Sequence, residues 1–311
     1  MLTAVRNSIS KISDVINTIS EKSYFTNVYG LGRSLIAFGT LLTLAFNSKY
    51  TLFYEPMFND KVSEIDGLNS INLFLLFDYS LLEIPKIIAI LILILVISGI
   101  FPRITGILHW WVSFSFLNSA TLVEGGDQIS TCITLFLVPI TLLDKRKNHW
   151  DNSYKEKNHY INLIVYLLFI LISLQISVLY LQSSIEKPYK VEEWMDGTAL
   201  YYWFNNNIFG LNKLMRLIIN PIFENKTLLF IINWGVIIFE MILFGAIFME
   251  KKNRKRLLPF AILFHFLIAI IFGLVSFFFA MFGSLILYLY PKNENLNFKK
   301  YENYIRRKAK V

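Results

Sequence analysis

The sequence has little of what soluble enzymes use. Of its 311 residues only Cys132 is a cysteine, which excludes a disulfide within the chain, a thiol pair and a Cys-based metal cluster. Charged residues are 17% of the chain and hydrophobic residues 55%, more apolar surface than a soluble core absorbs. H-E-x-x-H, G-x-S-x-G and a Gly-rich phosphate loop are also missing, so no hydrolase or nucleotide-binding signature is present. The composition indicates a polytopic membrane protein.

No segment has the pattern of a cleavable signal peptide. The first long apolar run starts near Val28, carries Arg33 and is not followed by a small-residue cleavage site. Before it, apolar residues recur at steps of three and four from Leu2 to Ile19, which predicts an amphipathic helix on the membrane surface. A second surface helix is predicted around 208–219, where apolar residues surround two cations.

Apolar runs long enough to cross a hydrocarbon core of about 30 Å account for most of the chain. They cover 28–46, 85–101, 104–122, 129–143, 160–181, 227–249 and 257–290. The last run is too long for one crossing and is expected to break near 273–276. The sequence therefore predicts an all-α, polytopic membrane helix bundle with about eight spans.

Basic residues support this count. The net charge is +8, but the Lys and Arg residues cluster between apolar runs and not on a continuous face, so nucleic acid is not an expected partner. With eight spans, the basic segments 144–159, 250–256 and 299–310 all fall on one side, which is predicted to be cytoplasmic together with both termini. The predicted organisation is an amphipathic helix (1–27), a transmembrane domain (28–290) and a basic tail (291–311), with membrane lipids as partners.

Ionisable groups inside spans cost about 2.5 to 3.5 kcal/mol each at the helix centre, so each needs a partner or a function. The topology predicts two depths. Arg33, His109 and His265 are expected towards the cytoplasm with Glu240 nearer the middle, and Asn118, Glu124, Asp127, Gln128, Lys187 and Asn233 towards the outside. Asn233 and Glu240 are two helical turns apart and are expected to face the same way.

Several of these residues have two interpretations. Arg33 is a charge clamp for a substrate, or else an ion-pair partner of Glu240 or a side chain that reaches the lipid headgroups. His265 is part of a proton relay or a packed, hydrogen-bonded core residue. Glu124 and Asp127 lie on either side of two glycines. Either they provide a general base or bind a cation, or they form a polar hairpin between two spans.

Lys187 lies just after an apolar run, in the stretch LQSSIEKPYKVEEWMDG. It either points into water or is partly buried, in which case the ammonium form is disfavoured and the amine becomes available as a base or nucleophile. Ser183 or Ser184 with Lys187 would also form a serine–lysine pair.

Two stretches carry a family resemblance. YFTNVYGLGRSLIAFGTLLTLAFN and NSATLVEGGDQISTCITLFLVPITLLDKR closely resemble the sporulation-delaying protein B family, bacterial membrane proteins encoded with secreted peptide toxins. That family belongs to a superfamily named for a horizontally transferred transmembrane domain, which includes vitamin K-dependent gamma-carboxylase. A local similarity to the carboxylase rests on Tyr180, Lys187, Trp194, Gly197 and the later His265.

The resemblance implies a bacterial cytoplasmic membrane protein that matures a secreted toxin peptide from its precursor, together with a small companion protein of the same operon. It also implies that Lys187 is the counterpart of the carboxylase base. Pro188 and Tyr189 depart from the carboxylase spacing, and the large lumenal domain is absent. Vitamin K and carboxylation are therefore not transferred, and the cofactor stays unassigned.

The resulting hypothesis is an outward-facing pocket in which a peptide or quinone-like molecule meets Lys187 near Glu124 and Asp127. His265 is added to this catalytic set, and the predicted substrate-binding residues are Arg33, Asn118, Gln128, Trp194 and Glu240. The alternative function is a non-catalytic membrane scaffold or export chaperone for the precursor. A transporter is disfavoured because the sequence shows no inverted repeat.

Overall fold

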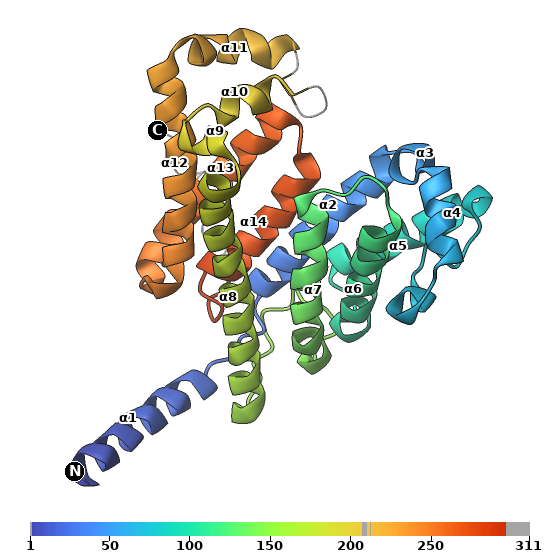
Figure 1. The fold of residues 1–311 in the computed structure, drawn as a ribbon. Coiled ribbons are helices and arrows are strands. Elements are labelled where there is room, and N and C mark those ends of the chain that lie inside the picture. The colour runs from blue at the N-terminus through green and yellow to red at the C-terminus, as the bar shows by residue number, and fades with distance from the viewer. Residues whose placement is uncertain (1, 207–209, 212, 297–311) are drawn as a thin grey trace, which may run out of the picture.

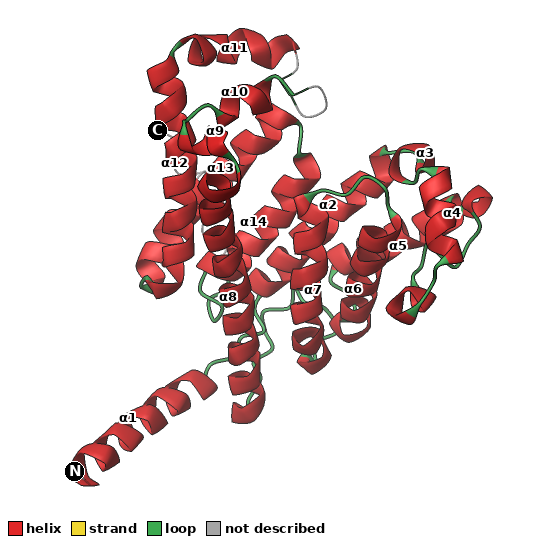
Figure 2. Cartoon of the chain, in the orientation of Figure 1, coloured by secondary structure: helices red, strands yellow, loops and turns green. Residues whose placement is uncertain are grey.

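The computed structural model describes residues 2–206, 210–211 and 213–296, and within them the chain is helical with no strand (Figures 1 and 2). The α-helices are α1 (Leu2–Ser20), α2 (Asn27–Phe46), α3 (Lys49–Leu52), α4 (Glu55–Ser63), α5 (Glu83–Ser98), α6 (Pro102–Ser119), α7 (Gly125–Leu143), α8 (His159–Lys190), α9 (Glu192–Met195), α10 (Ala199–Phe204), α11 (Lys213–Glu224), α12 (Lys226–Gly245), α13 (Lys251–Phe272) and α14 (Val275–Leu289). Short 3₁₀ helices are η1 (Gly67–Ile71), η2 (Tyr79–Leu81) and η3 (Ala246–Phe248).

Each predicted span corresponds to a helix: α2, α5, α6, α7, α8, α12, α13 and α14. Five stretches are long and apolar enough to cross a membrane, namely α2, α7, α8, α12 with η3, and α13. The helix α14 is apolar but shorter, at 15 residues, and the count of eight crossings stays a prediction. The predicted break in the last apolar run is confirmed, because α13 ends at Phe272 and Gly273 closes it with a left-handed φ of 76°.

The helix α8 is longer than the apolar run that predicts it. The sequence places its end at Leu181, but it continues to Lys190, for 32 residues and about 48 Å. Glu186 accepts hydrogen bonds from Gln182 and Lys190, each four residues away, which stabilises this polar extension. Ser183 and Lys187 consequently lie on a helix face and not in an outer loop.

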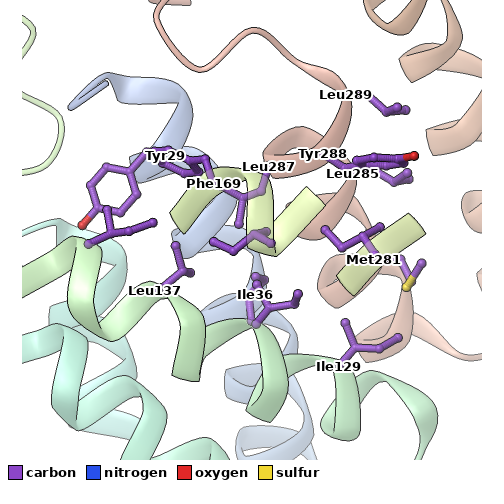
Figure 3. Packing of buried hydrophobic residues seen from close by; sticks show 14 of the residues in the cluster. Tyr29, Ile36, Ile129, Leu137, Phe169, Met281, Leu285, Leu287, Tyr288 and Leu289 are labelled. Carbon is purple, nitrogen blue, oxygen red and sulfur yellow. The ribbon is translucent and has the colours of Figure 1, made fainter. Parts of the chain in front are cut away.

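The main core is built from α2, α7, α8 and α14. Figure 3 shows Tyr29 and Ile36 of α2 gathered with Leu137 of α7, Phe169 of α8 and Leu285 of α14. The helices α2 and α14 approach closely through glycines, since a Cβ atom on Gly39 would lie 2.8 Å from the Ser276 carbonyl oxygen. Small residues at such crossings let backbones pack together where no hydrophobic effect drives association.

The basic segments meet at one end of the bundle, as far as the structure describes them. Asn27 donates from its side chain to the Leu296 carbonyl, and Lys255 of α13 pairs with Glu294 at 2.8 Å. The helix α1 is attached at the same end, because the Asn162 side chain of α8 donates to the Ser20 carbonyl at 2.9 Å. The tail beyond residue 296 lies outside the described residues, and which side of the membrane this end faces stays a prediction.

The predicted amphipathic helices are present in part. The helix α1 extends away from the bundle (Figure 1), with Ile12, Val15 and Ile16 exposed. Of the second predicted helix, Ile208 lies outside the described residues, and α11 covers the part from Lys213 onwards. The helices α9, α10 and α11 lie over the far ends of α8 and α12, opposite the basic end.

Candidate functional site

An ion pair between α8 and α12 joins the side chains of Lys187, Glu240 and Ser183. The Lys187 ammonium donates to both carboxylate oxygens of Glu240, each at 2.5 Å, and to the Ser183 hydroxyl at 2.6 Å. Ser183 in turn donates to Glu240 at 3.2 Å. The side chains are mostly buried, with 21% of Lys187 and 9% of Glu240 exposed. All three ammonium hydrogens are therefore engaged.

The pair lies deeper than the sequence predicts for Lys187. Glu240 is about 21 Å along the axis of α12 from Lys226, within the candidate span that runs to Phe248. A side chain on a helix leans towards the helix N-terminus, so Lys187 reaches back along α8 to the level of Ser183. A paired charge at this depth marks a functional-site hypothesis.

Trp194 of α9 lies beside the pair. The Lys187 nitrogen lies 5.4 Å from the centroid of the Trp194 ring, within cation–π range. Asn233, seven residues before Glu240, donates to the Trp194 carbonyl at 2.9 Å, so the two polar residues of α12 face α8 and α9 as expected. The side-chain oxygen of Asn233, Oδ1, is buried and has no hydrogen-bond partner among the described residues. It is therefore one acceptor that a ligand or a water could use.

His265 lies beside the same face of α8. Tyr180, which precedes Lys187 by two turns, shares a hydrogen bond of 2.8 Å with the Nε2 atom of His265. The other ring nitrogen, Nδ1, is buried without a partner in the described structure. The sequence places His265 towards the cytoplasm, but the structure puts it on the α8 face that continues to Lys187, because α13 turns back at Gly273 only eight residues later.

Glu124 and Asp127 form a second group, at the N-terminus of α7. They make a capping box in which the Asp127 carboxylate accepts from the Glu124 backbone N–H at 3.0 Å. The Glu124 carboxylate accepts a hydrogen bond from Ser276 of α14, and burial raises the pKa of Glu124 above its ordinary value. Both acids line a cavity of about 470 Å³ bounded by α2, α7 and the turn between α13 and α14. This volume suits a small ligand or a short peptide segment.

The structure does not join these two groups as the sequence hypothesis requires. Lys187 is paired with Glu240, and Glu124 and Asp127 are engaged with each other and Ser276. Phe277 separates them, since its ring lies 5.6 Å from that of His265 and a Cβ on Gly126 would meet its Cα at 2.8 Å. The sequence shows that Ser183 and Lys187 are one helical turn apart. It does not show that Glu240, 53 residues after Lys187, binds both.

Arg33 does not form the ion pair with Glu240 that the sequence suggests. It is fully buried in α2, where it donates to Thr105 of α6 at 2.8 Å and contacts the Nδ1 atom of His149 at 3.3 Å. Glu240 is not its counter-charge, because Glu240 pairs with Lys187. Burial, followed by the charges of Arg33 and Arg146, lowers the pKa of His149 to about 2, so this histidine is a neutral acceptor. Arg33 therefore ties α2, α6 and the loop between α7 and α8 together.

The other two predicted binding residues show no ligand-like arrangement. The Asn118 side chain donates within its own helix, to the Phe114 carbonyl at 2.8 Å. Gln128 is exposed on α7. Their assignment as substrate-binding residues stays a prediction.

Comparison with known proteins places the chain in a family. The HTTM domain family matches residues 130–292, about half of the chain. Two proteins of Bacillus subtilis (strain 168) are similar along nearly the whole length. The uncharacterized protein YitO is 36% identical over 302 residues, 96% of this chain and 95% of YitO. The sporulation-delaying protein SdpB is 35% identical over 294 residues, 94% of this chain and 88% of SdpB. The chain belongs to the sporulation-delaying protein B family and carries an HTTM domain.

The family assignment divides the two polar groups. The HTTM match contains Ser183, Lys187, Glu240 and His265, whereas Glu124 and Asp127 precede it. The relation to gamma-carboxylase that the sequence suggests is consistent with this domain. No solved structure matches the chain.

The sequence does not single out two residues, Ser276 and His149, that contact predicted site residues in the structure. Ser276 was placed only in a helix break, yet it binds Glu124. His149 was included only in a basic loop, yet it is buried against Arg33. A signal for His149 is present, because Trp150 beside it is a large aromatic residue in a basic loop, which indicates that this part of the loop packs against the helices.

Proposed function

We propose that this chain is a membrane-embedded factor that matures a secreted toxin-like peptide, with a small partner protein, through chemistry at Lys187. The observation that carries the proposal is the ion pair of Lys187 and Glu240 at mid-depth of α12, under Trp194. Kinship to SdpB supports the biological role. A charge pair without a function would be a costly feature at this depth, since burying two ions removes their hydration.

The geometry favours a switchable base over a serine–lysine hydrolase. In the structure the Lys187 nitrogen donates a hydrogen bond to Glu240, and the Ser183 hydroxyl donates one to Glu240 as well. Lys187 is thus not placed to take the proton of Ser183. Transfer of one proton from Lys187 to Glu240 would convert the ion pair into a neutral amine and a neutral acid. The free amine then acts as a base or nucleophile towards the peptide.

The experiment uses the native bacterium with its own copy replaced by variants, and measures mature peptide in the medium by mass spectrometry. Lys187→Met removes the base, and we expect a loss of at least about 100-fold, the scale of general base catalysis. The matched control is Lys190→Met, which removes a lysine of the same helix that is paired with Glu186 at the surface. Membrane abundance of each variant is measured on the same cells.

A charge reversal separates chemistry from architecture. Lys187→Glu with Glu240→Lys restores an ion pair but moves the amine to α12, so we expect the peptide to remain absent. Normal peptide in the Lys187→Met strain would remove the site assignment. Normal peptide in the reversed strain would show that the pair only holds α8 to α12.

The alternative, a scaffold or export chaperone for the precursor, is favoured by α1, which exposes Ile12, Val15 and Ile16 beyond the bundle. It predicts that Lys187→Met is harmless, whereas charged substitutions at these three positions abolish recovery of the partner protein in a pull-down.

A further inference from the structure

A second cavity lies at the basic end of the bundle and is independent of the lysine site. It has a volume of about 310 Å³ and lies between the end of α1, α8, the start of α13 and the segment after α14. Four of its lining residues are cations: Lys22, Lys251, Arg254 and Lys292. No Asp or Glu is among its lining residues. Four basic side chains thus line this space, and no carboxylate lines it.

The cations are poorly compensated by the protein. Lys292 donates to the Tyr290 carbonyl at 2.8 Å, and the Nε atom of Arg254 is buried with no hydrogen-bond partner in the part of the chain described. Glu294, two residues from Lys292 in the chain, is paired with Lys255 at 2.8 Å. None of the four lining cations forms an ion pair with a described carboxylate. Buried donors without partners are costly, so a ligand that accepts hydrogen bonds would be stabilising here.

Two further features favour an anion. Burial, and then the charge of Arg254, holds the pKa of Lys292 well below its ordinary value, and a bound anion would oppose both effects. Lys251 and Arg254 also belong to the first turn of α13, where the backbone N–H groups and the helix dipole are positive and Glu250 makes no side-chain cap.

The remaining walls are aromatic and apolar. Tyr24 and Tyr166 line them with ring centroids 5.3 Å apart, together with Phe169 and Ile170 of α8 and Ile19 of α1. An anion-binding side next to an apolar side matches a group that carries a phosphate and an acyl chain. Because α1 is amphipathic and ends at this cavity, the lipid surface on which α1 would lie is close to it.

We propose that this cavity binds the phosphate of an anionic membrane lipid, with Arg254 and Lys292 as its principal contacts and Lys22 and Lys251 at its rim. Binding would fix the end of α1 to α8 and α13. Basic pockets between membrane helices are a known place for anionic headgroups. The shared chemistry is a phosphate oxyanion, so a soluble phosphate is the other source that the experiment must separate.

The test uses the purified full-length chain in detergent and short-chain fluorescent phosphatidylglycerol as the probe. Arg254→Gln with Lys292→Gln removes two charges from the cavity, and we expect affinity to fall by about tenfold or more. The charge-matched control, Lys252→Gln with Arg256→Gln, removes two exposed cations of the same helix that do not line the cavity. Lys292→Gln alone is measured as well, in case the double variant unfolds, and thermal unfolding is recorded for each protein.

Competition identifies the source of the phosphate. Displacement of the probe by unlabelled phosphatidylglycerol, but not by phosphatidylcholine or millimolar inorganic phosphate, is the expected result. Displacement by inorganic phosphate as effectively as by lipid would overturn the lipid assignment. An equal loss of affinity in the cavity variant and its control, or no loss in either, would overturn the site.

Discussion

The pair of Lys187 and Glu240 makes a quantitative prediction about stability. Glu240→Gln keeps the shape of the side chain but removes its charge, leaving the Lys187 ammonium with Ser183 and the Trp194 ring. Breaking a buried ion pair by removing one partner costs about 3 to 5 kcal/mol. Because 21% of the Lys187 side chain is exposed, we expect the lower end of this range, about 3 kcal/mol.

Removing both charges should cost less than removing one. With Lys187→Met and Glu240→Gln together no unpaired charge is left, so we expect a total loss of about 1 kcal/mol. The free energy of unfolding would be measured for the four proteins of this double-mutant cycle, by titrating a denaturing detergent into mixed micelles. The control is the same cycle on Lys190 and Glu186, an exposed pair for which we expect a coupling of no more than about 0.5 kcal/mol. If the effects of the two single substitutions at 187 and 240 add within about 0.5 kcal/mol, the interpretation of the pair as a buried, coupled unit is refuted.

Two further predictions concern packing and pH. A Cβ on Gly106 of α6 would collide with the Thr141 side chain of α7, so Gly106→Ala should cost about 1 to 3 kcal/mol. Gly235→Ala, where a Cβ meets nothing within 4 Å, is the matched control and should be neutral or stabilising in the same thermal unfolding assay. For His149, whose pKa falls to about 2 in the folded state, the unfolded chain takes up a proton below about pH 6.5 and the folded chain does not. Its contribution is therefore complete above pH 6.5 and is lost as the pH falls, by up to about 1.4 kcal/mol per pH unit, so His149→Gln should flatten the decline in stability between pH 6.5 and 5. An unchanged slope would contradict the burial of a neutral His149.

The helices themselves follow from local sequence. Apolar runs of this length must form helices in a membrane because their backbone groups have no other hydrogen-bond partners there. The break at Gly273 is also predictable. A helix of the 34 residues in the last apolar run would be much longer than one membrane crossing needs, and glycine adopts the left-handed conformation that ends a helix. The extension of α8 to Lys190 was not, because it depends on polar pairs along the helix where hydropathy is already low.

The site residues were predictable as types but not as partners. The sequence singles out Lys187, Glu240 and His265 because ionisable groups in or beside spans are costly, and Trp194 through the local similarity to the carboxylase. It assigned Lys187 to Glu124 and Asp127, which are close to it in predicted depth, and Glu240 to Arg33. Depth along a span is one coordinate only, and two residues at the same depth can lie on different sides of a bundle.

The sequence by itself thus determined that the chain is a helical membrane protein, where most helices lie, and which family it belongs to, because hydrophobicity and motifs act locally. Only the tertiary structure decided that Glu240 pairs with Lys187 and that His149 contacts Arg33. It also decided that Lys22, Arg254 and Lys292 line one cavity. These groups come from segments far apart in the chain, and only the packing of the helices brings their charges within the few ångströms over which they interact.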